Sequence, residues 1–182
     1  MTRRILRTLR LDPSDTVVFD RAAEPGEIAV VGSFMFWDVD PAALTGRARQ
    51  AFRSGFLGLG SFGFSTLVSV GSVTEEERAA AAASLAARLR DQFGAPDDAS
   101  ALAVAEEELA FSEELASGHE PGTVIALSRS VEAEGVRERF RTLRRRGSPQ
   151  ALPVIGLVRS DDAAEERAER VDLVALVRRA NG

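Results

Sequence analysis

The chain carries few side chains that could perform covalent chemistry. It contains no Cys, no Lys and no Tyr, and its single histidine is His119. These absences exclude a thiolate nucleophile, a Schiff-base or P-loop lysine and a two-histidine metal site. His119 follows a predicted helix, whose C-terminal end stabilises a cation, and no nucleophile-elbow motif accompanies it. We therefore predict no catalytic residue, no metal site and no cofactor.

A glycine-rich passage matches the letters of the dinucleotide-binding fingerprint at Gly58-Leu59-Gly60-Ser61-Phe62-Gly63. That fingerprint requires a strand before it and a helix after it, so that the helix N-terminus meets the pyrophosphate. Here a predicted helix precedes the glycines and a predicted strand follows them. We interpret the passage as a bent connection into a buried strand.

The same passage places small polar side chains beside an arginine and an exposed backbone, a combination that can hold a small anion. An alternative function is therefore a small anionic-ligand-binding module, or an enzyme, with its site near Trp37, Arg53, Ser61 and Ser65. The full set of candidate ligand-binding residues is Trp37, Arg53, Ser54, Gly58, Gly60, Ser61, Gly63 and Ser65.

Arginines alternate along one predicted strand, so that they share a face of it. The candidate protein-interaction residues are Arg137, Arg139, Arg141 and Arg144. Their charge complements a run of glutamates at residues 106–108, so the two faces could pair within the fold or between subunits, or the arginines could dock a partner. Nucleic acid is the least favoured partner, because Phe140 points away from the arginines and the net charge is −5.

The composition favours a soluble globular protein. A chain of 182 residues with 45% hydrophobic content fits one domain with a sizeable core. No apolar run approaches the roughly 18 residues of a membrane span, and the first residues lack a signal-peptide pattern. Without cysteine there is no disulfide framework. We expect a cytoplasmic protein with no membrane attachment.

Alternation of apolar residues and turn signals predict mostly strands outside the middle of the chain. The expected strands are residues 4–11, 16–19, 28–37, 65–70, 123–127 and 136–142, the last two forming a hairpin. Helices are expected at Pro41, over 47–53, from a capping box of Thr74 and Glu77 to Gly94, and from Asp98 to Ser117. This order predicts an α+β fold, with a mainly antiparallel sheet and two amphipathic helices packed on one face.

Beyond Arg146 the composition changes, so we predict a domain over residues 1–146 and an appended C-terminal segment over 147–182. The segment contains a short apolar run, 153–158, and a predicted helix from Asp162 to Arg179. An apolar stripe on that helix needs a partner, on its own domain or on a second subunit. The stripe consists of Val171, Leu173, Val174, Leu176 and Val177.

Four stretches of the chain resemble one uncharacterised bacterial family, a domain of unknown function, over about residues 4–146. They are residues 6–16, 32–37, 50–58 and 140–144. The resemblance implies no activity, cofactor or catalytic residue. It implies an accessory role, because the family is associated with accessory genes for molybdenum-containing oxidoreductases, beside a protein similar to biotin/lipoate ligases. The main functional hypothesis is therefore a non-catalytic accessory protein that binds another protein and forms a homodimer.

Overall fold

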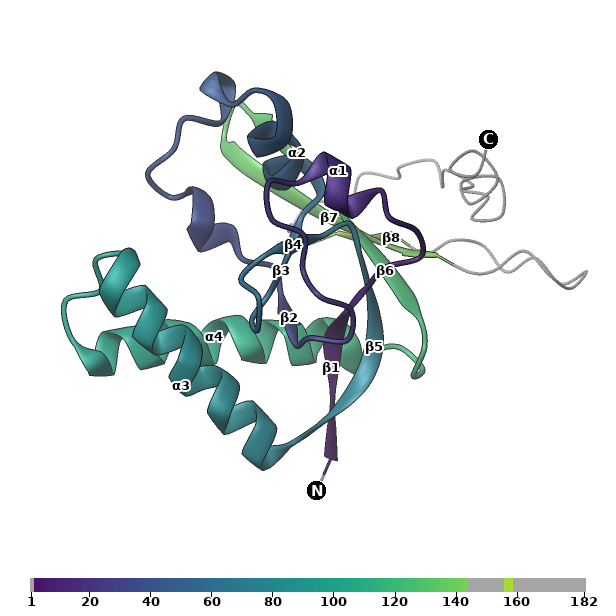
Figure 1. The fold of residues 1–182 in the computed structure, drawn as a ribbon, viewed down its shortest axis with the longest axis vertical. Coiled ribbons are helices and arrows are strands. Elements are labelled where there is room, and N and C mark those ends of the chain that lie inside the picture. The colour runs from purple at the N-terminus through teal and green to yellow at the C-terminus, as the bar shows by residue number, and fades with distance from the viewer. Residues whose placement is uncertain (1, 144–155, 159–182) are drawn as a thin grey trace, which may run out of the picture.

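A five-stranded antiparallel sheet forms the centre of the fold (Figure 1). The computed structural model describes residues 2–143 and 156–158 of the chain. The strand order is β1-β5-β6-β7-β8. Their bounds are Thr2–Leu9 for β1, Leu67–Thr74 for β5, Val124–Glu132 for β6, Gly135–Leu143 for β7 and Gly156–Val158 for β8. The predicted hairpin is β6–β7, whose register pairs Arg129 with Glu138.

A smaller antiparallel sheet, with order β2-β3-β4, holds the glycine-rich passage. Its strands are β2 (Ala29–Val30), β3 (Phe56–Gly58) and β4 (Phe64–Ser65). An isolated bridge between Arg7 and Ile28 connects it to β1. The glycine-rich passage is thus a bent connection between short strands, as the sequence predicted.

Two long helices, α3 (Glu75–Gln92) and α4 (Asp98–Ser117), pack against each other on one side of the sheet, as Figure 1 shows in teal. The capping box of Thr74 and Glu77 opens α3 as predicted. Leu85 and Leu109 of these helices are buried in one core cluster with Ile5 of β1. The α+β class is therefore confirmed, with two amphipathic helices on one face.

Two predicted strands are wrong. Residues 16–19 were expected to be a strand, but Asp15–Val18 forms the short helix α1. The amides of Val17 and Val18 donate to the carbonyl of Ser14, and the buried Asp15 carboxylate accepts hydrogen bonds from the amide and hydroxyl of Thr66. This contact comes from a segment far along the chain, and it outweighs the local preference for extended backbone.

The expected strand over 28–37 is also interrupted. Only Ala29–Val30 is strand, and Ser33–Phe36 forms the 3-10 helix η1. The break lies at Gly32, whose φ of +71° suits glycine and ends the extended run. Of the aromatic residues after it, Phe34 is buried in the core, whereas Trp37 is exposed.

The remaining short helices follow the prediction. The 3-10 helix η2 (Pro41–Ala43) begins with proline and is capped by Asp40, and α2 spans Gly46–Ser54. Within residues 2–143 and 156–158, no helix is both long and apolar enough to cross a membrane. The predicted helix from Asp162 to Arg179 lies outside the described residues.

Candidate functional site

A cavity of about 590 Å³ opens between the hairpin β6–β7, helix α4 and the segment that carries η1 and η2. Charged, hydroxyl, aromatic and aliphatic side chains all contribute to its wall. The lining residues are Val31, Ser33, Phe36, Trp37, Val39, Pro41, Phe52, Glu108, Phe111, Arg129, Val136 and Glu138. The cavity is therefore built from five separate stretches of sequence.

Arg129 forms the buried base of the cavity, with its side chain only 1% exposed. Its Nε donates to Glu138 Oε1 at 2.9 Å, and its two terminal nitrogens donate to three backbone carbonyls. These carbonyls belong to Phe52 (2.9 Å), Gly55 (3.2 Å) and Val31 (2.5 Å). Burial lowers the pKa of Arg129, and the nearby carboxylates oppose that shift. Because each nitrogen of the guanidinium is bonded within the fold, Arg129 ties the hairpin to α2 and β2.

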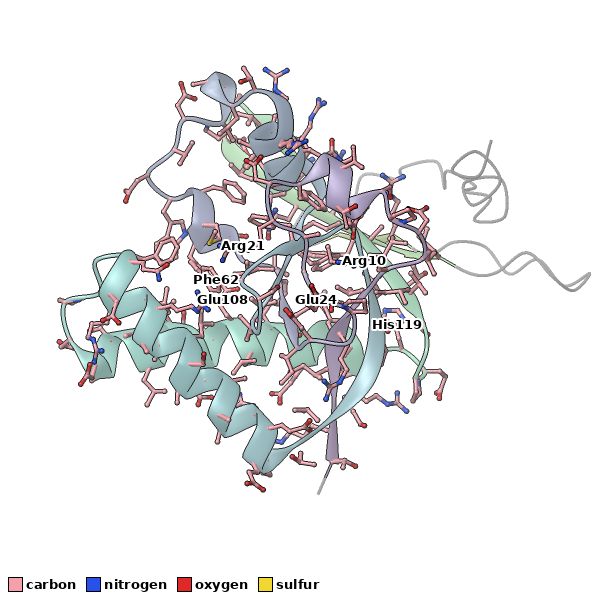
Figure 2. The ribbon with its side chains drawn as sticks, in the orientation of Figure 1. Arg10, Arg21, Glu24, Phe62, Glu108 and His119 are labelled. Atoms are coloured by element: carbon pink, nitrogen blue, oxygen red, sulfur yellow. The ribbon has the colours of Figure 1, made fainter. Side chains whose placement is uncertain are left out.

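Two carboxylates complete the charged part of the wall. Glu138, which pairs with Arg129, also accepts a hydrogen bond from Ser33 Oγ. Glu108, which projects from α4 (Figure 2), accepts a hydrogen bond from the Gly32 amide at 3.1 Å. One arginine thus faces two carboxylates, so the lining carries a net negative charge.

Aromatic and aliphatic side chains form the rest of the wall. Phe36 and Phe52 meet edge to face with centroids 5.4 Å apart. Trp37 stands at the mouth and is 64% exposed, with its ring 6.2 Å from that of Phe34. A large exposed aromatic side chain next to a cavity is costly in water, so it indicates a contact surface.

Further exposed apolar residues surround Trp37. Val39 and Val136 line the cavity, and Val131 lines an adjoining hollow of about 350 Å³ that also includes Arg49 and Arg53. We call Trp37, Val39, Val131 and Val136 the apolar rim. The hollow and the cavity share Pro41, Phe52 and Arg129, so the rim spans both.

The structure brings only part of the predicted ligand set to these cavities. Trp37 lines the cavity and Arg53 lines the adjoining hollow. Ser54 accepts a hydrogen bond from Gln50 Nε2 at 2.7 Å. Ser65 is buried, and its hydroxyl lies 2.7 Å from the carbonyl of Leu67. Neither serine lines the cavity or the hollow.

Of the remaining predicted residues, Gly58, Gly60 and Ser61 lie against the carboxylate of Glu27, whereas Gly63 packs against the backbone of Ala22. Glu27 accepts hydrogen bonds from the amide and hydroxyl of Ser61, at 2.9 and 3.0 Å. A Cβ at Gly58 would overlap Glu27 Oε2 and would lie 2.8 Å from Ala23 Cβ, so a larger residue here would require Glu27 and Ala23 to move. The amide and hydroxyl of Ser61, which could bind an external anion, therefore already bind the carboxylate of Glu27.

The predicted interaction arginines also have partners within the fold. Arg137 and Arg139 pair with Glu132 of the same hairpin at 3.1 and 3.5 Å. Arg141 also interacts with another group of the protein. Arg144 lies outside the described residues.

The acidic helix α4 pairs with arginines other than those of β7. Glu106 and Glu113 accept hydrogen bonds from Arg78 of α3 at 2.5 and 2.8 Å. Although partial burial opposes the shift, these bonds raise the pKa of Arg78. Arg137 and Arg139 thus pair within the hairpin, and Glu106 and Glu113 pair with α3.

His119 lies in the turn after α4, where its amide donates to Ala116 and its carbonyl accepts from Arg4. Its Nε2 is buried and has no hydrogen-bond partner among residues 2–143 and 156–158. In this part of the chain, no group of three or more His, Cys, Asp or Glu side chains is arranged to hold a metal ion.

Sequence reasoning missed Arg129, Glu108, Glu138 and Ser33. One signal could have found Arg129: it lies between Leu127 and Val131 at every second position of a strand, so it shares a face with apolar residues. An arginine on such a face is buried only when it is paired. Its partners could not be read from the sequence.

Comparison with known proteins gives a family for most of the chain. The family described as "Family of unknown function (DUF6505)" matches residues 2–157. No curated protein and no solved structure matches the chain. The family match includes the resemblance noted over residues 4–146 and extends into β8.

Proposed function

For this chain, which belongs to the family of unknown function DUF6505, we propose a non-enzymatic binding module that docks a protein partner. In this proposal, an arginine or lysine side chain of the partner enters the cavity beside Trp37. The observation that carries it is the combination of two carboxylates, one arginine that is hydrogen-bonded at each nitrogen, and an exposed tryptophan around one opening.

The charge of the lining favours a cation. The positive charge of Arg129 is balanced by Glu138, and its terminal nitrogens already donate to three carbonyls. Arg129 therefore offers little attraction to an anion. Glu108 contributes a second negative charge at the same wall. A guanidinium or ammonium group placed there would form charge-assisted hydrogen bonds with carboxylate oxygens.

The aromatic and aliphatic wall fits the rest of such a side chain. Arginine and lysine have an apolar stem of several carbons below the charge, which packs well on apolar surface. The ring of Trp37 can also attract a cation directly through its π face. A site of this kind binds the charge and the stem together.

The apolar rim favours a protein over a free small molecule. Trp37, Val39, Val131 and Val136 are all exposed and lie around the two adjoining cavities. Exposed apolar residues gathered around a cavity are typical of protein-binding surfaces, and aromatic side chains carry much of the binding energy there. The accessory role implied by the family resemblance agrees with a docking protein, and its partner would then belong to a molybdenum-containing oxidoreductase system.

The small-anion alternative has less support. Glu27 fills the glycine-rich loop, and two carboxylates line the cavity at Trp37. An anionic ligand would have to displace Glu27, approach the two carboxylates against charge repulsion, or bind only in the adjoining hollow that Arg49 and Arg53 line.

A selection from random peptides tests the proposal. The native chain should enrich peptides with Arg or Lys next to apolar residues, and Trp37→Ala or Glu108→Gln should lose most of that binding. Val17→Ala is the matched control, because Val17 is also 64% exposed but does not line the cavity. Enrichment of acidic peptides, or equal binding by the native chain and Trp37→Ala, would show that the proposal is wrong.

A further inference from the structure

We infer that residues 171–179 of the same chain occupy the cavity at Trp37 when no partner is bound. The segment would then compete with the partner from within the molecule. The inference rests on the proposed function for the identity of the competitor, whereas occupancy of the cavity by the segment can be measured alone.

The direction of β8 brings the chain to the cavity. Strand β8 is antiparallel to β7, with Gly156 opposite Arg141 and Val158 opposite Arg139. It therefore runs toward the end of β7 that carries Glu138 and Val136, both of which line the cavity. Figure 1 shows β8 beside β7 at the edge of the sheet. At Val158 the chain is one register position from a cavity residue.

The length of the intervening chain permits the contact. Twelve residues, 159–170, separate Val158 from Val171. They would span about 20 Å as a helix and about 40 Å when fully extended. Either path is long enough to reach a cavity that begins at the neighbouring strand position.

The chemistry of residues 171–179 complements the cavity. The sequence Val171-Asp172-Leu173-Val174-Ala175-Leu176-Val177-Arg178-Arg179 places two arginines directly after an apolar run. The cavity offers apolar and aromatic walls beside Glu108 and Glu138. Residues 159–170 contain no Val, Leu, Ile, Phe or Met, so the match is confined to this part of the segment.

A tethered segment needs little intrinsic affinity to fill the site. Connection through a short linker gives an effective concentration in the millimolar range. A partner would therefore have to compete with a segment whose local concentration is in the millimolar range, or engage the apolar rim as well.

Trp37 reports directly on the proposed contact, because it is the only tryptophan. In the full chain, Leu173→Asp with Leu176→Asp should move Trp37 emission to longer wavelength and increase its quenching by acrylamide. Ala164→Asp with Ala168→Asp is the matched control, since it adds the same charge outside residues 171–179, and it should leave both signals at the native value. Circular dichroism verifies that each variant is folded.

A peptide of residues 169–182 gives the reverse experiment. When it is added to the Leu173→Asp, Leu176→Asp chain, it should return the Trp37 emission to the native wavelength, and the change should saturate as the peptide concentration rises. The same peptide with Arg178→Glu and Arg179→Glu should not. Equal Trp37 quenching in the native and Leu173→Asp, Leu176→Asp chains would overturn the inference. Protection of Trp37 from acrylamide that increases with protein concentration would also overturn it, because the occupant would then be a second copy of the chain.

The peptide selection separates this inference from the proposed function. When the segment fills the cavity more than nine-tenths of the time, selected Arg peptides should bind the Leu173→Asp, Leu176→Asp chain at least about tenfold more tightly than the native chain. Equal affinity for both chains would overturn the inference and leave the proposed function intact. If Trp37 becomes exposed but no external peptide binds, the proposed function fails and the inference stands.

Discussion

Arg129 places a full positive charge in the interior of the protein, where an unpaired charge is strongly unfavourable. It is tolerated because Glu138 faces it across the hairpin and three carbonyls accept its remaining hydrogen bonds. The same pair supplies the base of the cavity. Stability and the shape of the candidate site therefore depend on the same side chain.

Replacing Arg129 should test this dependence. Arg129→Met leaves the Glu138 carboxylate and three carbonyls without their donor, and breaking a buried pair in this way costs about 3–5 kcal/mol. Arg137→Met, on the same hairpin, breaks a partly exposed pair with Glu132 and should cost about 1 kcal/mol or less. Urea unfolding followed by circular dichroism measures both. A smaller loss for Arg129→Met than for Arg137→Met would contradict this account.

Among the elements, helix α3 has the most local support. Thr74 Oγ1 accepts from the Glu77 amide, and Glu77 accepts from the Thr74 amide at 3.0 Å. The hydrogen bond from the Thr74 backbone lowers the pKa of Glu77, slight burial opposes it, and Arg7 lowers the pKa further. The ionised carboxylate is therefore the form that stabilises the helix start.

The stability contributed by Glu77 should depend on pH. Because its pKa in the folded protein lies below the usual 4.5, the contribution is fully present above that value and disappears as the pH falls through the lowered pKa. The difference in unfolding free energy between the native chain and Glu77→Gln should thus be largest near neutral pH and shrink on acidification, as measured by urea unfolding.

Thr74→Ala provides the control for that experiment. It removes the acceptor for the Glu77 amide and a hydroxyl donor to the carboxylate at 3.3 Å, but keeps the backbone donor and Arg7. It should lower stability at every pH and keep most of the pH dependence. A difference between native chain and Glu77→Gln that stays constant from neutral to acidic pH would refute the role of the ionised cap.

For the whole molecule, the extent of the folded domain depends on whether strand β8 belongs to it. The boundary at residue 146 was a prediction from composition. Strand β8 pairs with β7 in the main sheet, and the family match reaches residue 157. Both observations favour a folded unit that includes β8, because without it the edge of β7 would have unpaired backbone groups at residues 139–141.

Two shortened chains distinguish these boundaries. A chain that stops at residue 158 keeps the β7–β8 pairing and should unfold cooperatively close to the temperature of the full chain. A chain that stops at residue 146 loses the pairing and should unfold at a lower temperature. Thermal unfolding by circular dichroism measures the difference, and equal midpoints for the two would instead support the boundary at 146.

The sequence by itself determined the elements whose signals are local. Helices α3 and α4, the hairpin and the short helix at Pro41 were predictable because caps, glycine stops and apolar periodicity act over a few residues. From these elements the α+β class followed. At the site, Trp37 was the one predicted ligand residue that lines the cavity.

Tertiary structure alone decided the features that depend on distant partners. Asp15 starts a helix while it binds Thr66, and Glu27 fills the loop that had looked suited to an outside anion. Arg129 meets the carbonyl of Val31, 98 positions earlier in the chain. Backbone carbonyls carry no sequence signature, and a buried charge finds its acceptors only when the sheets and helices have packed together.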